Sequence, residues 1–183
     1  MSLIGAPFRY GQGKDGVEKG CQAIRDAGLA ESITSLGWRF DDRGDAETVP
    51  PSPSDPESSM GGKHGYSVCK TNEAIHNKVR SAAEDGNFVL TLGGDHSIAM
   101  GSTAGILAAR PNAGVLWVDA HADINLPSSS PSGNIHGMPV SFLMRLLQPG
   151  DVPGSEWLEN VPVLAPENLV YVGLRDVDPF ERQ

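Results

Sequence analysis

The chain has 183 residues and a formal net charge of −9, with 23 acidic against 14 basic residues. This balance argues against nucleic-acid and membrane-surface partners, and it suits a small cationic substrate. No apolar run approaches the roughly 18 residues of a membrane-spanning helix, and no basic segment followed by an apolar one opens the chain. We therefore expect a soluble, cytoplasmic protein of one domain's length, in which Cys21 and Cys69 are free thiols.

The first forty residues favour one short strand followed by helical structure. Residues 2–6 have the composition of a buried strand, and a loop rich in glycine follows. Val17, Cys21 and Ile24 then recur at the spacing of one helical face. A short second strand is expected to begin at residues 38–40.

Residues 45–65 change in composition and predict a long surface loop of low complexity. Serines, acidic residues and a pair of glycines accompany four prolines in this segment: Pro50, Pro51, Pro53 and Pro56. Proline at this density excludes both a stable helix and a central strand. His64 lies in the loop, and we expect it to be exposed to solvent.

A longer helix is predicted directly after the loop. Val68, Ile75, Val79 and Ala82 share one helical face, and a glycine ends the pattern. His76 lies at the edge of this stripe and is therefore expected at the surface.

The next segment combines a predicted buried strand with a polar turn. Residues 88–92 are apolar, residues 93–97 read Gly-Gly-Asp-His-Ser, and a helical run extends from 98 to 110. Paired glycines permit a sharp turn and a close approach of the backbone. His96 thus lies at a strand-to-helix junction, where on its own it would be an ordinary loop histidine.

A second predicted strand also ends in polar residues, and a metal site explains them better than ordinary polar residues at a strand end. The apolar residues 115–118 have the character of a strand buried on both faces of a parallel sheet, and they lead directly into Asp119, His121 and Asp123. Alternate residues of an extended segment share a face, so these three side chains are expected to point the same way. Carboxylates and imidazoles gathered at the carboxyl ends of parallel strands suit a divalent cation, because unpaired buried charge is costly. His96 is expected to join them.

The remainder of the chain predicts a polar loop, a helix and a last strand. Residues 126–133 are rich in serine and proline, a helix is expected from 140 to 147, and a strand from 169 to 173. Asp178, followed by proline and then Glu181, has the form of a helix N-terminus. The chain stops within that first turn, so we expect it to be cut short.

Several motifs together resemble the ureohydrolase family, and arginases in particular. Gly-Gly-Asp-His-Ser at 93–97 and Asp-Ala-His-Ala-Asp at 119–123 are similar to the first two signature motifs of that family. The opening residues 4–18, the segment 132–142 and the segment 171–179 continue the resemblance to arginases. The third arginase motif, Ser-Phe-Asp-Val-Asp, is not present in this chain.

The resemblance implies a fold and a set of site residues. It implies a three-layer α/β fold with a mainly parallel sheet, like that of arginases and deacetylases, formed here by residues 1–183 as a single domain that is incomplete at its C-terminus. The implied metal ligands are His96, Asp119, His121 and Asp123, with Asp123 also counted with the catalytic residues beside the proton-shuttling His136. The implied substrate-binding residues are Asn125, Ser132, Asn134, Asp178 and Glu181.

The activity implied by the resemblance is the hydrolysis of L-arginine to L-ornithine and urea by a manganese-activated hydroxide. In the complete pattern two Mn²⁺ ions are held, and His96, Asp119 and Asp123 would bind one while His121 and Asp119 would reach the other. Arginases commonly form trimers. Because the third motif is missing, we expect only partial metal occupancy and weak or no activity from this chain alone.

Two alternatives stay open on the sequence. One is a non-catalytic truncated product that associates with arginase subunits. The other is a different ureohydrolase, such as an agmatinase, which would keep the metal motifs but would have no need for residues that contact an α-carboxylate.

Overall fold

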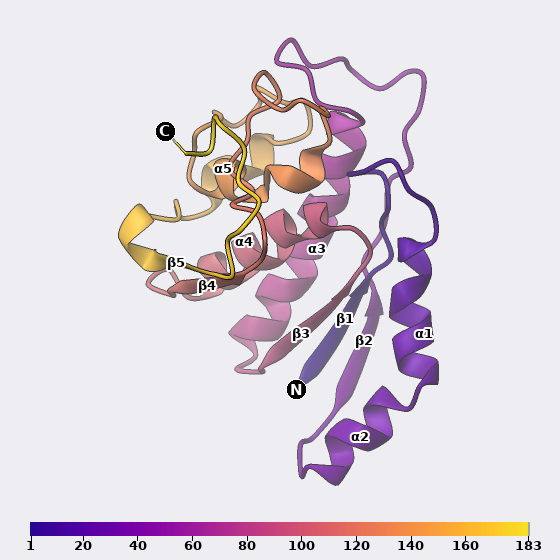
Figure 1. Ribbon diagram of the computed structural model, residues 1–183. Helices are drawn as coiled ribbons and strands as arrows, with labels where there is room; N and C mark the ends of the chain where they lie inside the picture. Colours follow the sequence, from indigo (N-terminus) through magenta and orange to yellow (C-terminus); the bar gives the residue numbers. More distant parts are fainter. Residues whose placement is uncertain (183) are drawn as a thin grey trace.

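The computed structural model describes residues 1–182, which fold as an α/β protein with parallel strands (Figure 1). The strands are β1 (Ser2–Ala6), β2 (Asp41–Asp45), β3 (Val89–Gly93), β4 (Val115–Val118) and β5 (Leu169–Val172). The α-helices are α1 (Gly20–Asp26), α2 (Leu29–Ser35), α3 (Gly65–Glu84), α4 (Ala99–Ala109) and α5 (Pro139–Leu143). Short 3₁₀ turns, the second of which begins at His96, occupy Val17–Lys19, His96–Ile98, Ile135–Gly137, Glu156–Asn160 and Pro166–Asn168.

The strand β1 lies in the middle of three layers, in a sheet where β2 and β3 flank it and run parallel to it. All five residues of β1 are buried, as expected, and alternate side chains enter different cores. Leu3 packs with Cys21 on the side of α1 and α2, whereas Ile4 and Ala6 join the larger core formed with α3 and α4. Figure 1 shows these two helix pairs on opposite sides of the sheet. This arrangement confirms the predicted three-layer α/β architecture.

The strands β4 and β5 form a separate two-stranded parallel sheet. Within residues 1–182, β3 pairs only with β1, and β4 pairs only with β5. The expectation that 115–118 is a fully buried strand is therefore wrong for one of its faces. Leu116 and Val118 are 65% and 70% exposed, and their register partners Val170 and Val172 are exposed beside them.

The close approach of α3 and α4 builds most of the larger core. Gly101 lies so near to α3 that a Cβ atom on it would stand 2.4 Å from the Asn72 carbonyl oxygen. The Gly101 N–H donates to the Asn72 side-chain oxygen at 2.7 Å, and the Asn72 amide donates back to the Val68 carbonyl at 2.9 Å. The buried polar side chain of Asn72 is thus fully engaged at the helix contact.

Several local expectations are corrected by the structure. Val17 and Ile24 are exposed, and Cys21 is the buried residue of α1. Val17 lies in the 3₁₀ turn before α1 and therefore does not continue one helical face with Cys21 and Ile24. The second strand lies at Asp41–Asp45, after the predicted position at 38–40. His76 is buried rather than at the surface, since its ring packs 5.1 Å from the ring of Trp157.

Other differences lie in the second half of the chain. The helix expected over 140–147 ends at Leu143, and Arg145 adopts a left-handed backbone with φ 58°. Residues 179–182 form a turn in place of the expected helix. The segment 46–64 contains no helix or strand, and both Cys21 and Cys69 are free thiols. Among residues 1–182, none of the helices combines the length and the apolar character needed to cross a membrane.

Replacing Gly101 with alanine should destabilise the fold. Alanine is favoured over glycine in a helix by about 1 kcal/mol, but here the added methyl group would collide with the backbone of α3. We expect a net loss of about 1 to 3 kcal/mol in the free energy of unfolding, measured by urea denaturation. The control is Gly13→Ala, whose added Cβ meets nothing within 4 Å and should leave stability unchanged. Equal stability of the two variants would contradict the helix-contact argument.

Candidate metal centre

The first metal-ligand candidate is positioned by the turn that follows β3. Asp95 is buried and accepts from the Gly11 N–H and the Ser97 N–H, each at 2.8 Å, which joins the N-terminal loop to the start of the 3₁₀ turn. Gly94 permits this arrangement, because a Cβ there would stand 2.1 Å from the Phe8 carbonyl oxygen. His96 follows at once and therefore projects from a fixed backbone at the carboxyl end of β3.

The segment after β4 reaches the same place by bending rather than by continuing as a strand. The expectation that Asp119, His121 and Asp123 alternate along an extended backbone is wrong, since residues 119–121 form a bend and Asp123 has φ 54°. Aspartate tolerates this left-handed conformation better than most residues. The His121 N–H donates to Asp119 Oδ1 at 2.9 Å, which closes the bend.

These side chains converge on a small volume between the two sheets. His96 Nδ1 lies 2.9 Å from Asp123 Oδ2 and 3.3 Å from Asp119 Oδ2. One ligand atom from each of the three residues falls within 4.8 Å of the others, a spacing that can hold a metal ion. His121 Nδ1 lies 3.1 Å from the other oxygen of Asp119. Asp119 thus directs one carboxylate oxygen toward each histidine.

The electrostatics of the group follow from this geometry. The pKa of His96 is raised because its ring is hydrogen-bonded to the Asp123 carboxylate, although burial works against the shift. Burial would raise the pKa of Asp119, but the His121 backbone N–H and the neighbouring histidines produce a net lowering. Burial lowers the pKa of His136, so its imidazole is neutral near pH 7. A cation replacing the proton on His96 would meet the same two carboxylate groups, those of Asp119 and Asp123.

A second group of polar residues forms the wall beside these ligands. The buried Asn125 amide donates to Asp178 Oδ2 at 2.8 Å, linking the segment after β4 to the one after β5. Glu181 joins the same two segments, since its two oxygens accept from the Ile124 N–H and the Asp178 N–H, both at 3.0 Å. The bond from the Asp178 N–H to Glu181 is one that a helix N-terminus of the predicted form can contain, and it forms here without a helix.

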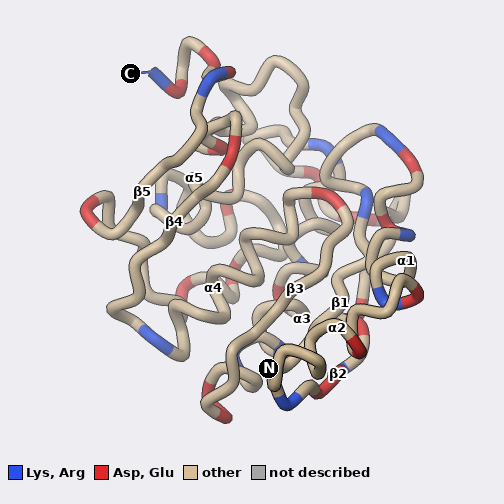
Figure 2. Tube along the Cα trace, turned by 60° about the horizontal axis from the view of Figure 1, so that its bottom comes forward, with Lys and Arg blue, Asp and Glu red and all other residues tan. Residues whose placement is uncertain are grey.

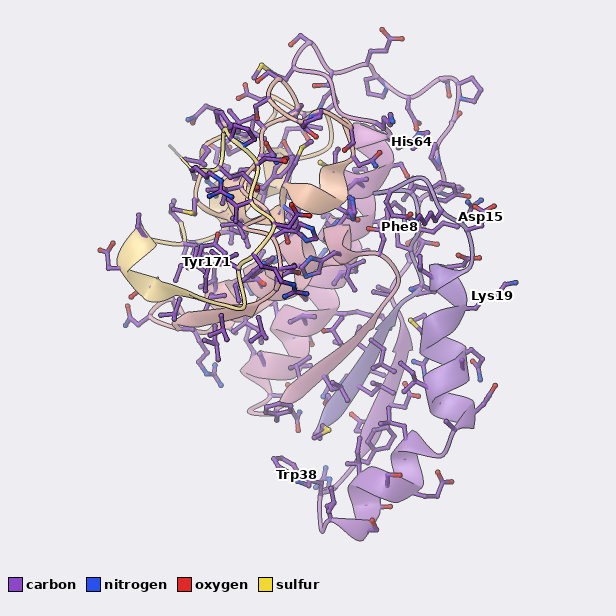
Figure 3. The ribbon with its side chains drawn as sticks, viewed as in Figure 1. Phe8, Asp15, Lys19, Trp38, His64 and Tyr171 are labelled. Atoms are coloured by element: carbon purple, nitrogen blue, oxygen red, sulfur yellow. The ribbon has the colours of Figure 1, made fainter. Side chains whose placement is uncertain are left out.

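One cleft of about 470 Å³ brings together every candidate site residue from both groups. It is lined by His96, Asp119, His121, Asp123, Asn125, Ser132, Asn134, His136, Asp178 and Glu181, and additionally by Ser130, Gly137 and Asp176. Figure 2 shows acidic residues on both segments that leave β4 and β5. His64 stands apart at the start of α3, away from Tyr171 on β5, as Figure 3 shows, and it is exposed as expected.

Sequence reasoning missed several residues that hold the site in place. The Trp117 indole N–H lies 3.3 Å from Asp123 Oδ2, and the Tyr171 hydroxyl donates to the Ala122 carbonyl at 2.7 Å. Asp176 Oδ2 lies 3.6 Å from His121 Nε2. In the sequence Trp117 and Tyr171 have the character of ordinary strand residues. The only signal for a role in the site is that each lies near the carboxyl end of its strand, close to polar residues that follow it.

The fold and the cleft define an α/β protein with a candidate metal centre at the carboxyl ends of its parallel strands. The model of the arginase family matches residues 1–183. The chain therefore belongs to the arginase family.

Similar proteins cover the chain from end to end. It is 45% identical to "Arginase, hepatic" of Aquarana catesbeiana over 99% of this chain and 55% of that protein. It is 44% identical to "Arginase-2, mitochondrial" of Homo sapiens over 99% of this chain and 51% of that protein. The chain thus spans about half the length of these relatives.

Solved structures show the same fold. The native arginase of Bacillus caldovelox superposes with a TM-score of 0.87 at 35% identity, covering 99% of this chain and 60% of that one. Entamoeba histolytica arginase, solved in complex with L-ornithine, gives a TM-score of 0.82 at 32% identity, again covering 99% of this chain and 60% of that one. These neighbours confirm the predicted arginase-like fold.

Metal binding should stabilise the folded chain through the converging ligands. A ligand that binds only the folded state adds about 2.7 kcal/mol when its free concentration is 100 times its Kd. We expect Mn²⁺ to raise the thermal midpoint of the unmodified chain but not that of His96→Asn. His64→Asn, which changes an exposed histidine that does not line the cleft, is the matched control and should respond like the unmodified chain. The same response from all three proteins would contradict a metal site at His96.

Proposed function

We propose that this chain carries the metal-binding and substrate-binding half of an enzyme that hydrolyses L-arginine to L-ornithine and urea. The observation that supports it most is the convergence of His96, Asp119 and Asp123 in a cleft whose other wall is polar. A metal centre beside hydrogen-bonding groups is the arrangement that metal-assisted hydrolysis requires. Membership of the arginase family supports the reaction class.

The donor set fits Mn²⁺. Carboxylate oxygens with some imidazole nitrogen are suitable ligands for this cation. Asp123 is so buried that solvent cannot stabilise a charge on its carboxylate, whereas a bound cation would. His96, Asp119 and Asp123 would hold one ion, and His121 with the second oxygen of Asp119 would face another. When bound, the metal would lower the pKa of a water molecule, so that hydroxide would be available at neutral pH to attack the guanidinium carbon.

The protein's own groups would bind and orient the substrate. We assign Asp178 to the α-amino group of the amino acid, and Asn125, Ser132 and Asn134 to its carboxylate side. Asn125 already donates to Asp178, which fixes both side chains relative to each other. Glu181 would act by holding this wall, because both of its oxygens accept backbone N–H groups.

His136 is the group we assign to proton transfer. Its imidazole is half-buried at the edge of the cleft, and its backbone N–H donates to the Gly11 carbonyl at 3.0 Å. Because burial lowers its pKa, the ring is free to accept a proton near pH 7 and to return it to the leaving amine.

Two observations separate this proposal from its alternatives. An agmatinase would have no use for groups that bind an α-carboxylate, the role assigned here to Ser132 and Asn134, and both residues line the cleft. A purely structural partner of other subunits would have no use for the buried, histidine-paired Asp123.

Substrate preference tests the assignment directly. A site built to hydrogen-bond a charged group rejects an analogue that lacks it by a factor on the order of 10⁴. We expect L-arginine to be preferred over agmatine by kcat/KM for urea release with Mn²⁺ present, or by calorimetric affinity where release is slow. Ser132→Ala should weaken L-arginine binding about tenfold, because it removes one hydrogen bond to a charged group.

The control for that series is Ser128→Ala, an exposed serine of the same loop that does not line the cleft. It should bind both compounds as the unmodified chain does. Equal handling of L-arginine and agmatine would reject the arginase assignment.

The isolated 183-residue chain should have little activity and marginal stability. The third motif, whose two aspartates the family resemblance requires for the metal pair, is not in this sequence, and the facing edges of β3 and β4 are unpaired among the described residues. Urea release with Mn²⁺ and thermal unfolding are the measurements. Turnover on the order of 10 per second with a sharp unfolding transition would contradict this expectation.

A further inference from the structure

Trp117 of β4 touches two of the three converging ligands at once. It is almost fully buried, with 6% of the residue exposed. The indole N–H points at Asp123 Oδ2 across 3.3 Å, and the indole ring lies 5.2 Å from the imidazole of His96 with an angle of 44° between the planes.

The indole of Trp117 donates to the same Asp123 oxygen that faces His96. Asp123 Oδ2 is the atom that faces His96 Nδ1 at 2.9 Å and belongs to the group that can hold a metal. A carboxylate oxygen has two lone pairs, so it can accept from the indole with one and bind a cation with the other. A hydrogen bond to a ligating carboxylate fixes its orientation, and such outer partners commonly change metal affinity 10- to 100-fold.

The ring contact restrains the second ligand. The His96 side chain is 43% exposed, so the orientation of its ring depends on specific contacts such as the one with Asp123. The indole is a second such contact, since it packs against the imidazole in a tilted arrangement at the spacing of a favourable aromatic pair. Both contacts therefore act on the direction in which ligand atoms point, rather than on the fold as a whole.

We propose that Trp117 is a positioning residue that pre-organises Asp123 and His96 for metal binding. The inference rests on the proposed metal-dependent function and deepens it. Trp117 is not among the residues that line the cleft, and its effect passes through the two ligands.

The chain offers a closely matched control in Trp157. Its indole N–H donates to the Cys69 carbonyl at 3.1 Å, and its ring lies 5.1 Å from the imidazole of His76. Both tryptophans thus combine one indole hydrogen bond with one histidine contact, but the partners of Trp157 are Cys69 and His76, neither of which belongs to the converging ligands. Substituting either by phenylalanine removes the N–H and keeps an aromatic ring.

The experiment measures the Kd for Mn²⁺ of the 183-residue chain by the electron paramagnetic resonance of free Mn²⁺. We expect Trp117→Phe to bind about tenfold more weakly and Trp117→Leu, which also loses the ring contact, to bind more weakly still. Trp157→Phe should keep the Kd of the unmodified chain. Urea denaturation of both phenylalanine variants separates lost stability from lost affinity.

A spectroscopic reading on the folded chain completes the test. With ¹⁵N-labelled tryptophan and Zn²⁺ as a diamagnetic probe, the indole N–H signal of Trp117 should shift on metal addition while that of Trp157 stays. An unchanged Kd for Trp117→Phe, or an unmoved Trp117 signal, overturns the inference while leaving the proposed function intact. Absence of Mn²⁺ binding in the unmodified chain overturns the metal site and the inference together.

Discussion

The buried carboxylate of Asp123 is the constraint around which the cleft is assembled. A carboxylate removed from water must be hydrogen-bonded or paired, and the cost of failing to do so is several kcal/mol. Here His96 and Trp117 meet one of its oxygens, and its backbone carbonyl accepts from the Val140 N–H at 3.0 Å. The end of β3, the end of β4 and the start of α5 are thereby brought to one point.

The parallel strands explain why these contacts can form between distant parts of the sequence. The polar motifs follow the carboxyl ends of β3 and β4. The turn after β3 and the bend after β4 therefore meet, although the two strands are not hydrogen-bonded to each other. Glu181 then ties the segment after β5 to the segment after β4. The cleft is a junction of loops held by side chains, which is where α/β folds place their ligands.

The sequence predicted β1, β3, β4 and β5 closely, because apolar runs such as 2–6 and 115–118 have the composition of strands. It misplaced β2, whose residues 41–45 are mostly charged. It predicted exposure poorly, since whether Leu116 and Val118 are covered depends on which strands and helices are neighbours, and periodicity does not carry that information. The candidate residues were found by type and spacing, but the reason given for their convergence was wrong. A bend at Asp119 and a left-handed Asp123 bring the ligands together, and backbone dihedrals of this kind cannot be inferred from alternation.

The left-handed backbone at position 123 has a consequence for how substitutions there are interpreted. Two separate demands meet at this residue: a backbone with φ 54°, which costs most residues roughly 1 to 2 kcal/mol, and a negatively charged oxygen. Glycine meets the first demand alone, asparagine meets the first and keeps a neutral oxygen, and glutamate keeps the charge on a longer stem. Comparing these three in a saturation library would therefore separate the backbone tolerance of the position from its chemistry. An alanine substitution, which fails both demands at once, would confuse them.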